Sequence, residues 1–259
     1  MLNSIKPIFN IRPILRKSYG NSVYCEKHRR IFIDFFNSFS SLPFGYNPKF
    51  LKRSTFFKKA EEYLSIRSPL CAYEYHIKDE YIESINQFLN SGNSFVNILF
   101  AETGSLAVEL ALKAHIISSK SSLKIYSLKN SFHGIYGIGG GITIGSNTSL
   151  SRLKKIEDQL PGFNCVFKAI NNIDDLDMID DIKNSVLIIE PIQCTSGDLP
   201  LKTNLTSKIK QLQNKGLTLI VDEIQTGYLS TGTFWGHQQY DLNEPDIIIF
   251  GKKFQVCGC

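Results

Sequence analysis

Short runs of apolar residues recur along the chain, each suited in length to a buried strand. The runs are Asn97–Phe100, Leu123–Leu128, Val186–Ile189, Leu217–Val221 and Ile247–Phe250. Between them, apolar residues recur at helical spacing from Leu106 to Ala114, and a further helix is expected from Thr203 to Lys215. Apolar strands that alternate with helices predict an α/β fold with a mostly parallel sheet and helices on both of its faces.

The beginning of the chain has a different pattern. Aromatic and β-branched residues from Ile31 to Phe39 predict a strand, which leads into a turn at Leu42–Pro48. From Ala60 to Leu89 the spacing is helical, with an interruption at Ser68–Pro69. We therefore expect an N-terminal segment, residues 1–72, followed by the domain that contains the sheet, residues 73–259.

Composition and charge narrow the class of protein. The chain has 259 residues, of which 42% are hydrophobic and 20% charged, values that are ordinary for a globular protein. The net charge of +5 comes from scattered residues without a block of like charges, so nucleic-acid binding gains no support. No apolar run reaches the roughly 18 residues that a membrane span needs.

The cysteines bear on the cellular compartment. The chain has 6 cysteines, which are widely spaced and follow no secretory segment, so we predict reduced thiols in the cytoplasm. Cys257–Cys259 is too compact for a zinc knuckle and has no mate, so we expect no metal site. An organellar transit peptide is the alternative because basic residues precede the first acid, Glu26, but Pro7 and Pro13 oppose the amphipathic helix that it needs.

Two of the predicted strands end in residues that carry chemistry. The run Leu217–Val221 ends in Asp222, and the run Ile247–Phe250 is followed by Gly251 and Lys252. In open α/β sheets, reactive groups gather at the carboxyl ends of the strands. An acid and an amine at one edge suit pyridoxal phosphate, because the acid keeps the pyridine nitrogen protonated and the amine forms a Schiff base.

A third segment offers a seat for a phosphate. Small residues from Ala101 to Ala107, Gly104 and Ser105 among them, lie between a predicted strand and the next helix. The start of a helix offers free N–H groups and the positive end of its dipole. Such residues are also ordinary helix caps. The segment has no Walker lysine, and Gly137–Gly141 departs from the dinucleotide spacing, so a smaller phosphorylated cofactor is favoured over a nucleotide.

Together these segments resemble the class III aminotransferases, which are pyridoxal phosphate enzymes of fold type I. The matching segments, in family order, are Glu102–Lys113, Ser131–Gly134, Ile189–Gln193, Val221–Gly227 and Pro245–Lys252. Within the class, the residues around Ser65–Pro69, Thr231–Tyr240 and Phe250–Gly258 most resemble L-lysine 6-aminotransferase. The resemblance implies the large domain of that fold, here C-terminally truncated because family members continue into a small domain.

The resemblance assigns roles to the residues at the strand ends. Lys252 would be the catalytic lysine that forms the Schiff base, with Lys253 as a less suitable neighbour. Asp222 would pair with the pyridinium nitrogen. Gln225 would contact the side of the ring that carries the hydroxyl group.

The resemblance also assigns residues to the face of the cofactor ring and to its phosphate. Phe132 would stack on the ring, with His133 and Gly134 shaping the turn beside it. Gly104 and Ser105 would hold the phosphate. Glu190 also matches the family, and we interpret it as structural.

The implied reaction moves the terminal amino group of L-lysine to 2-oxoglutarate, in a homodimer. Other ω-amines, such as ornithine or 4-aminobutyrate, are an alternative donor class. The chain departs from the family at Ile135, where an arginine is common, and at Cys194–Gly197, which replaces Gly-Glu-Gly-Gly. A remnant without catalytic activity is therefore a further alternative.

Overall fold

The computed structural model describes residues 11–52, 55, 58, 60–61, 76–87, 97–118, 123–143, 165–171 and 173–259. The chain divides into two compact units, residues 1–67 and 68–259, and each is considered by itself. The predicted boundary between residues 72 and 73 lies outside the described residues.

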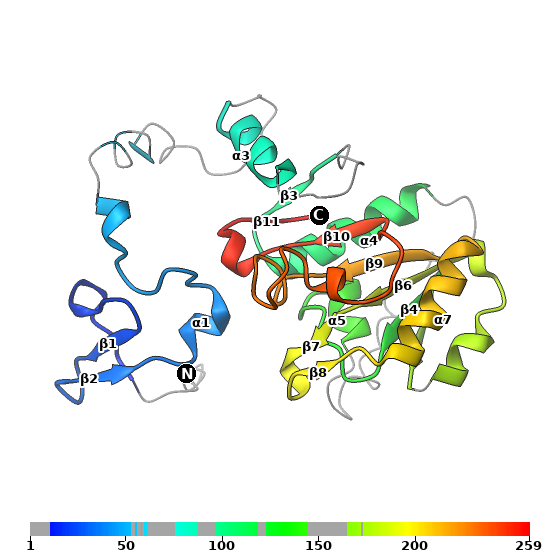
Figure 1. The fold of residues 1–259 in the computed structure, drawn as a ribbon, viewed down its shortest axis with the longest axis horizontal. Coiled ribbons are helices and arrows are strands. Elements are labelled where there is room, and N and C mark those ends of the chain that lie inside the picture. Colours follow the sequence, from blue (N-terminus) through cyan, green and yellow to red (C-terminus); the bar gives the residue numbers. More distant parts are fainter. Residues whose placement is uncertain are drawn as a thin grey trace, which may run out of the picture. The chain divides into compact units, whose positions relative to one another are not determined.

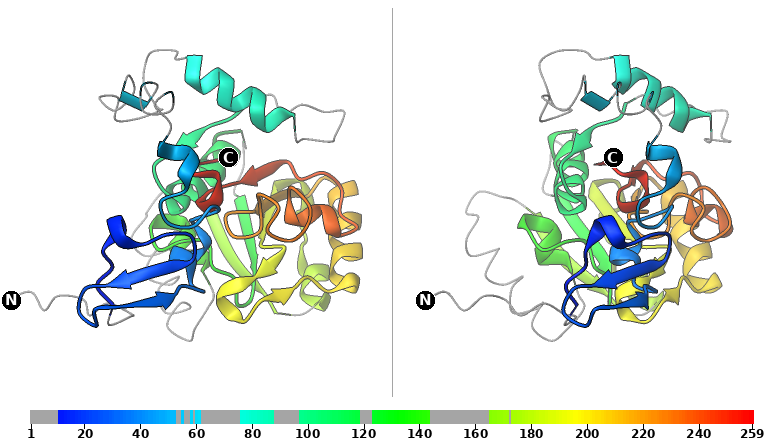
Figure 2. Two further views of the ribbon diagram at one scale, coloured as in Figure 1. Left: turned by 60° about the vertical axis from the view of Figure 1, so that its left-hand side comes forward. Right: turned by 90° about the vertical axis from the view of Figure 1, so that its left-hand side faces the viewer.

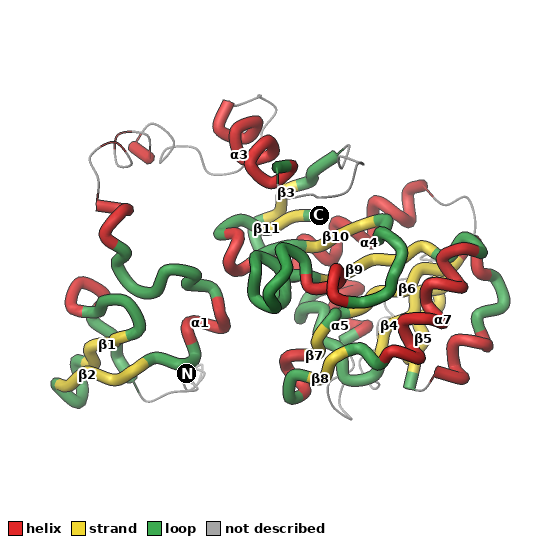
Figure 3. Tube along the Cα trace, in the orientation of Figure 1, coloured by secondary structure: helices red, strands yellow, loops and turns green. Residues whose placement is uncertain are grey.

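The larger unit is built on a parallel sheet (Figures 1 and 3). Its order is β10-β9-β6-β4-β5, and every neighbouring pair is parallel. The strands are β4 (Leu123–Leu128), β5 (Cys165–Ile170), β6 (Ser185–Ile189), β9 (Thr218–Asp222) and β10 (Ile247–Ile249). The prediction of a mostly parallel sheet is confirmed, and four of these strands lie where the apolar runs placed them, while β5 was not predicted.

Helices cover both faces of this sheet, as predicted (Figure 2). On one face, Ile125, Ile188 and Ile220 pack against α4 (Gly104–Ser118) and α5 (Gly137–Ile142). On the other face, the next residues along the same strands pack against α7 (Thr203–Asn214) and the 3-10 helix η3 (Ile173–Met178). These residues are Tyr126, Ile189 and Val221. Successive strand residues point to opposite faces, so each strand contributes to two separate cores.

Apart from η4 (Ile182–Asn184), which leads into the amino end of β6, the remaining elements surround the carboxyl edge of the sheet and its β10 side. They are α3 (His76–Asn86), β3 (Phe100–Ala101), β7 (Ile192–Gln193), η5 (Cys194–Ser196), β8 (Leu199–Pro200), η6 (Gly236–Gln239), η7 (Lys252–Phe254) and β11 (Cys257–Gly258). The predicted strand at 97–100 shrinks to β3, which pairs antiparallel with β11 rather than joining the parallel strands. An aromatic cluster that includes Trp235, Phe250 and Phe254 packs beside η7.

The smaller unit contains a hairpin. Its elements are η1 (Leu15–Lys17), β1 (Ser22–Cys25), β2 (Arg30–Ile33), α1 (Asn37–Ser40) and η2 (Lys49–Lys52), with β1 and β2 antiparallel. The predicted strand from Ile31 to Phe39 ends early because Asp34 turns the chain. Its Oδ1 accepts the N–H groups of Phe36 and Asn37 at 2.9 Å each, an Asx turn that competes with strand pairing.

A helix that crosses a membrane must be both long and apolar. In the ranges that the structure describes, no helix combines the length and the apolar character needed to cross a bilayer.

Candidate active site

The structure brings the ends of β9 and β10 together at one edge of the sheet. Ile249 of β10 is paired with Asp222 of β9 in parallel register, and Lys252 follows three residues later at the start of η7. The main chain is tied there too, because the N–H of Glu223 donates to the carbonyl of Ile249 at 2.8 Å. The acid and the amine therefore emerge from neighbouring strands at the same edge.

Asp222 is buried and held by a histidine. Its Oδ2 lies 2.9 Å from Nδ1 of His133, and the two side chains are 4% and 0% exposed. Its Oδ1 accepts the N–H of Ile224 at 3.2 Å. Each carboxylate oxygen has a further lone pair, so Asp222 can still accept a proton donor such as a protonated ring nitrogen.

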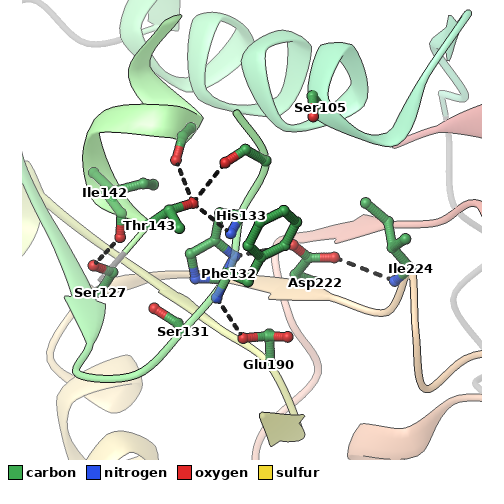
Figure 4. A network of polar contacts seen from close by, with 12 residues as sticks. Ser105, Ser127, Ser131, Phe132, His133, Ile142, Thr143, Glu190, Asp222 and Ile224 are labelled. Carbon is green, nitrogen blue, oxygen red and sulfur yellow. Dashed lines mark hydrogen bonds and ion pairs between the residues drawn. The ribbon is translucent and has the colours of Figure 1, made fainter. Parts of the chain in front are cut away.

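The turn that carries His133 is fixed by Thr143 (Figure 4). The Thr143 hydroxyl oxygen accepts the N–H of His133 at 2.9 Å and lies 2.8 Å from the carbonyl of Gly134. Behind it, Oε1 of Glu109 in α4 accepts the N–H of Gly139 at 2.6 Å near the start of α5. Sequence reasoning missed Thr143 and Glu109, because only the approach of α4 and α5 brings them to the turn.

Gly104 and Ser105 are the first two residues of α4. Oγ1 of Thr103 accepts the N–H of Leu106 at 3.2 Å, which caps the helix, while the first N–H groups of a helix have no intrahelical partner. Oγ of Ser105 accepts the N–H of Ile135 at 3.3 Å, so its hydroxyl hydrogen stays available to donate. The predicted phosphate seat thus lies against the turn that carries His133.

Gly134 shows how closely these two segments approach. Its φ of +106° favours glycine, and a Cβ there would lie 2.6 Å from Oγ of Ser105. Gly104 meets the end of β9 in a similar way, because a Cβ there would lie 2.8 Å from Cδ1 of Ile224. The start of α4, the turn after β4 and the end of β9 therefore form one packed cradle.

Lys252 lies in a strained backbone conformation. Its φ is +52°, a region that non-glycine residues rarely adopt and that is enriched at functional sites. Its Nζ donates to Oε1 of Gln225, and Nζ of Lys253 donates to the backbone carbonyl of Gln225 at 3.1 Å. Burial lowers the pKa of Lys252, against the opposing effect of Asp222, so a larger fraction of its amine is neutral and nucleophilic.

Phe132 connects the site to Glu190. Its side chain is 41% exposed, so the ring is available to a planar ligand, and its N–H donates to Oε2 of Glu190 at 2.8 Å. Glu190 is itself 5% exposed. Burial raises the pKa of its carboxyl to about 7.

Glu223, next to Asp222, organises the loop that follows. It is fully buried and accepts the N–H of Gly236 at 2.9 Å, the N–H of His237 at 2.8 Å and the hydroxyl of Thr226. Its Oε1 also lies 2.8 Å from Nδ1 of His237. Sequence reasoning gave Glu223 no role, although a second acid at the strand end was the available signal.

These groups suit a small planar ligand with a phosphate and a basic ring nitrogen. The free N–H groups at the start of α4 can receive the phosphate, the buried carboxylate of Asp222 can hold a proton on the ring nitrogen, and the amine of Lys252 can attack an aldehyde. The described residues hold no cluster of three or more His, Cys, Asp or Glu side chains arranged for a metal ion.

Comparison with known proteins identifies the family. The sequence profile of the class-III aminotransferases matches residues 9–256, and the chain belongs to this family. A [LysW]-aminoadipate semialdehyde/glutamate semialdehyde transaminase of Sulfolobus acidocaldarius is 34% identical over 227 residues, which cover 86% of this chain and 54% of that protein. The L-lysine-epsilon aminotransferase of Mycobacterium bovis is 28% identical over 272 residues, which cover 94% of this chain and 60% of that protein.

A solved structure shows the same fold. The lysine aminotransferase from M. tuberculosis, in its internal aldimine form, superimposes with a TM-score of 0.81 at 24% identity. The match covers 98% of this chain and 64% of that one. The predicted fold class and family are therefore confirmed. The chain spans 54% and 60% of the length of the two relatives named above.

Proposed function

We propose that this chain binds pyridoxal 5'-phosphate and carries out amino transfer from the terminal amine of L-lysine to 2-oxoglutarate. The observation that carries the proposal is the buried pair of His133 and Asp222, 2.9 Å apart, at the same sheet edge as Lys252. When bound, the cofactor supplies an electron-accepting ring that stabilises negative charge on the substrate carbon.

Each residue would then contribute one physical effect. The carboxylate of Asp222 holds a proton on the ring nitrogen, and His133 keeps that carboxylate in place. Gly104 and Ser105, at the start of α4, bind the phosphate. The ring of Phe132 covers one face of the cofactor and excludes water from it.

Lys252 would act as nucleophile and as proton carrier. Its lowered pKa favours the neutral amine that must attack the cofactor aldehyde and later accept a proton from the substrate carbon. Gln225 accepts a hydrogen bond from this amine, so it orients Nζ toward the site. Lys253 donates to the backbone of Gln225 instead, which makes it the less suitable nucleophile.

The amino donor is argued from the names of the relatives. Relatives of similar identity are named for [LysW]-aminoadipate semialdehyde, for L-lysine and for acetylornithine. All of these names fit a donor with an amine at the end of an alkyl chain. L-Lysine leads because the match to the L-lysine-epsilon aminotransferase covers 94% of this chain, against 86% and 65% for the other two relatives. Ornithine, 4-aminobutyrate and a non-catalytic remnant remain the alternatives. We also propose a homodimer in the cytoplasm.

Trapping the cofactor on the chain tests the proposal. We expect borohydride reduction in the presence of pyridoxal 5'-phosphate to leave one stable adduct, which peptide mass mapping places on Lys252. Lys252→Ala should abolish the adduct, while Lys253→Ala is the matched control and should retain it.

A substrate panel then follows the amino group. Lysine, ornithine and 4-aminobutyrate are each incubated with 2-oxoglutarate, and glutamate formation is measured. Greatest turnover with lysine supports the leading donor. An adduct on Lys252 without turnover of any donor would contradict the proposed activity but not the cofactor site.

A further inference from the structure

Glu190 is a buried carboxylate that has no part in the proposed chemistry. It is 5% exposed and directly follows β6. Burying an ionised carboxylate is unfavourable unless hydrogen bonds or opposite charges compensate. A neutral side chain such as glutamine would satisfy the N–H of Phe132 equally well, so the acid calls for a further explanation.

The sheet register relates Glu190 to Asp222. Ile189 of β6 is paired with Val221 of β9, and the two acids are the next residues along these strands. Side chains at paired positions point to the same face of a sheet. Both acids hold the same turn, because Glu190 accepts the backbone N–H of Phe132 and Asp222 contacts the ring of His133. Figure 4 shows both carboxylates close to this turn.

The charges around Glu190 couple it to the reacting amine. Burial raises the pKa of Glu190 to about 7, His133 and Lys252 act to lower it, and Asp222 acts to raise it. The coupling is mutual, because burial lowers the pKa of Lys252, while Asp222 and, to a smaller extent, Glu190 act to raise it.

Cys194 and Lys253 also lie near Lys252, and Asp198 is coupled in turn to the thiol of Cys194. Burial raises the pKa of the Cys194 thiol to about 12, so it is neutral at physiological pH. Burial and then the neighbouring charge of Lys252 lower the pKa of Lys253. The acids that act on Lys252 are therefore Asp222 and, above its pKa of about 7, Glu190.

We propose that Glu190 is a positioning residue with two tasks: it holds the turn of Phe132 and His133 over the site, and its negative charge adds to that of Asp222 in favouring the protonated amine of Lys252. The inference rests on the proposed function in taking Lys252 as the reacting amine and, for the first task, pyridoxal 5'-phosphate as the ligand of the site. A glutamine could perform the first task but not the second.

The second task is tested on the chain without cofactor. Competitive acylation at a series of pH values, read by peptide mass spectrometry, gives the midpoint at which the Lys252 amine becomes reactive. Glu190→Gln should move this midpoint to lower pH by about 0.5 units or more, because a nearby anion no longer favours the charged amine. The exposed Lys113 in the same spectra is the internal standard.

Asp246→Asn is the matched control. Oδ2 of Asp246 accepts the N–H of Leu219 at 2.8 Å near the start of β9. Like Glu190, it is a carboxylate that accepts a backbone N–H, but it lies at the opposite edge of the sheet. This variant should keep the wild-type midpoint for Lys252. A wild-type midpoint in Glu190→Gln would overturn the electrostatic task.

The first task is tested by cofactor affinity, measured from the change in fluorescence on titration with pyridoxal 5'-phosphate. Glu190→Ala leaves the N–H of Phe132 without its acceptor and should weaken binding at least ~5-fold, while Glu190→Gln keeps an acceptor oxygen and should bind more tightly than the alanine variant. Equal affinity of wild type and Glu190→Ala would overturn the positioning task. If the wild-type chain bound no cofactor, the proposed function would fail, yet the acylation result would still decide the role of the charge.

Discussion

At the scale of the residue, Glu190 makes the stability of the fold depend on pH in the sense opposite to most carboxylates. Its pKa in the folded chain is about 7, against about 4.3 in an unfolded chain. Between these values the folded state binds more protons than the unfolded state. The free energy of unfolding therefore falls as pH rises through this window, by roughly 4 kcal/mol in total, since each pKa unit is worth about 1.36 kcal/mol.

Glu190→Gln should remove this dependence. Urea unfolding at pH 5 and at pH 8 measures it, and the wild-type chain should lose more stability between the two than the variant does. Asp246→Asn should follow the wild-type dependence. An identical loss in wild type and Glu190→Gln would mean that Glu190 is already ionised at pH 5.

At the scale of the element, the turn between β4 and α5 depends on Gly134. We expect Gly134→Ala to destabilise the fold by about 1 kcal/mol through its positive φ, and by a further ~1–3 kcal/mol through the contact with Ser105. Chemical denaturation measures the sum of the backbone effect and the contact effect on the free energy of unfolding. Cofactor titration should show weaker binding, because the same contact moves the start of α4.

Gly197→Ala is the matched control for the turn. Its φ is +95°, but nothing lies within 4 Å of a Cβ there, so only the backbone effect of about 1 kcal/mol should remain. Equal destabilisation of the two variants would show that the approach of Ser105 does not constrain the turn.

Elements with apolar runs could be predicted, and those held by distant contacts could not. The strands β6 and β9 and the helix α7 follow from their own residues. The helix α5 does not, because glycines at 137 and 139–141 are poor helix formers and its start is capped by Glu109 from α4. The strand β5 was missed since Lys168 breaks its apolar run.

The same distinction applies to the site. Asp222 and Lys252 could be located because strand ends converge in an open sheet. The contact between Asp222 and His133 spans 89 positions of the chain, and the contact of Thr143 with the turn depends on how α5 folds back. Spacing along a sequence carries no signal for such contacts.

At the scale of the whole molecule, the two cores on either side of the sheet should respond independently. Ile188 belongs to the core under α4 and Ile189 to the core under α7. Each substitution to valine should cost about 0.5–1.5 kcal/mol. The double variant should equal the sum within ~0.5 kcal/mol, because the two side chains share no core.

Ile188 and Ile220 form the comparison pair. They are directly paired across β6 and β9 and belong to the same core, so their valine variants should deviate from additivity. Denaturant unfolding of the single and double variants gives both coupling energies. A larger coupling for the pair on opposite faces would contradict the separation of the two cores.

The adjacent acids at the end of β9 have a consequence for errors in folding. Asp222 contacts His133 in the turn after β4, and Glu223 anchors the following loop through His237. A slip of this strand by one position would move both acids in the same direction. One of the two places would then receive an acid of the wrong length, and the other would receive an apolar neighbour, Val221 or Ile224. Molecules in which this strand is misaligned would therefore lose both the ordered loop and the contact with His133. Molecules that retain only one of the two should not accumulate.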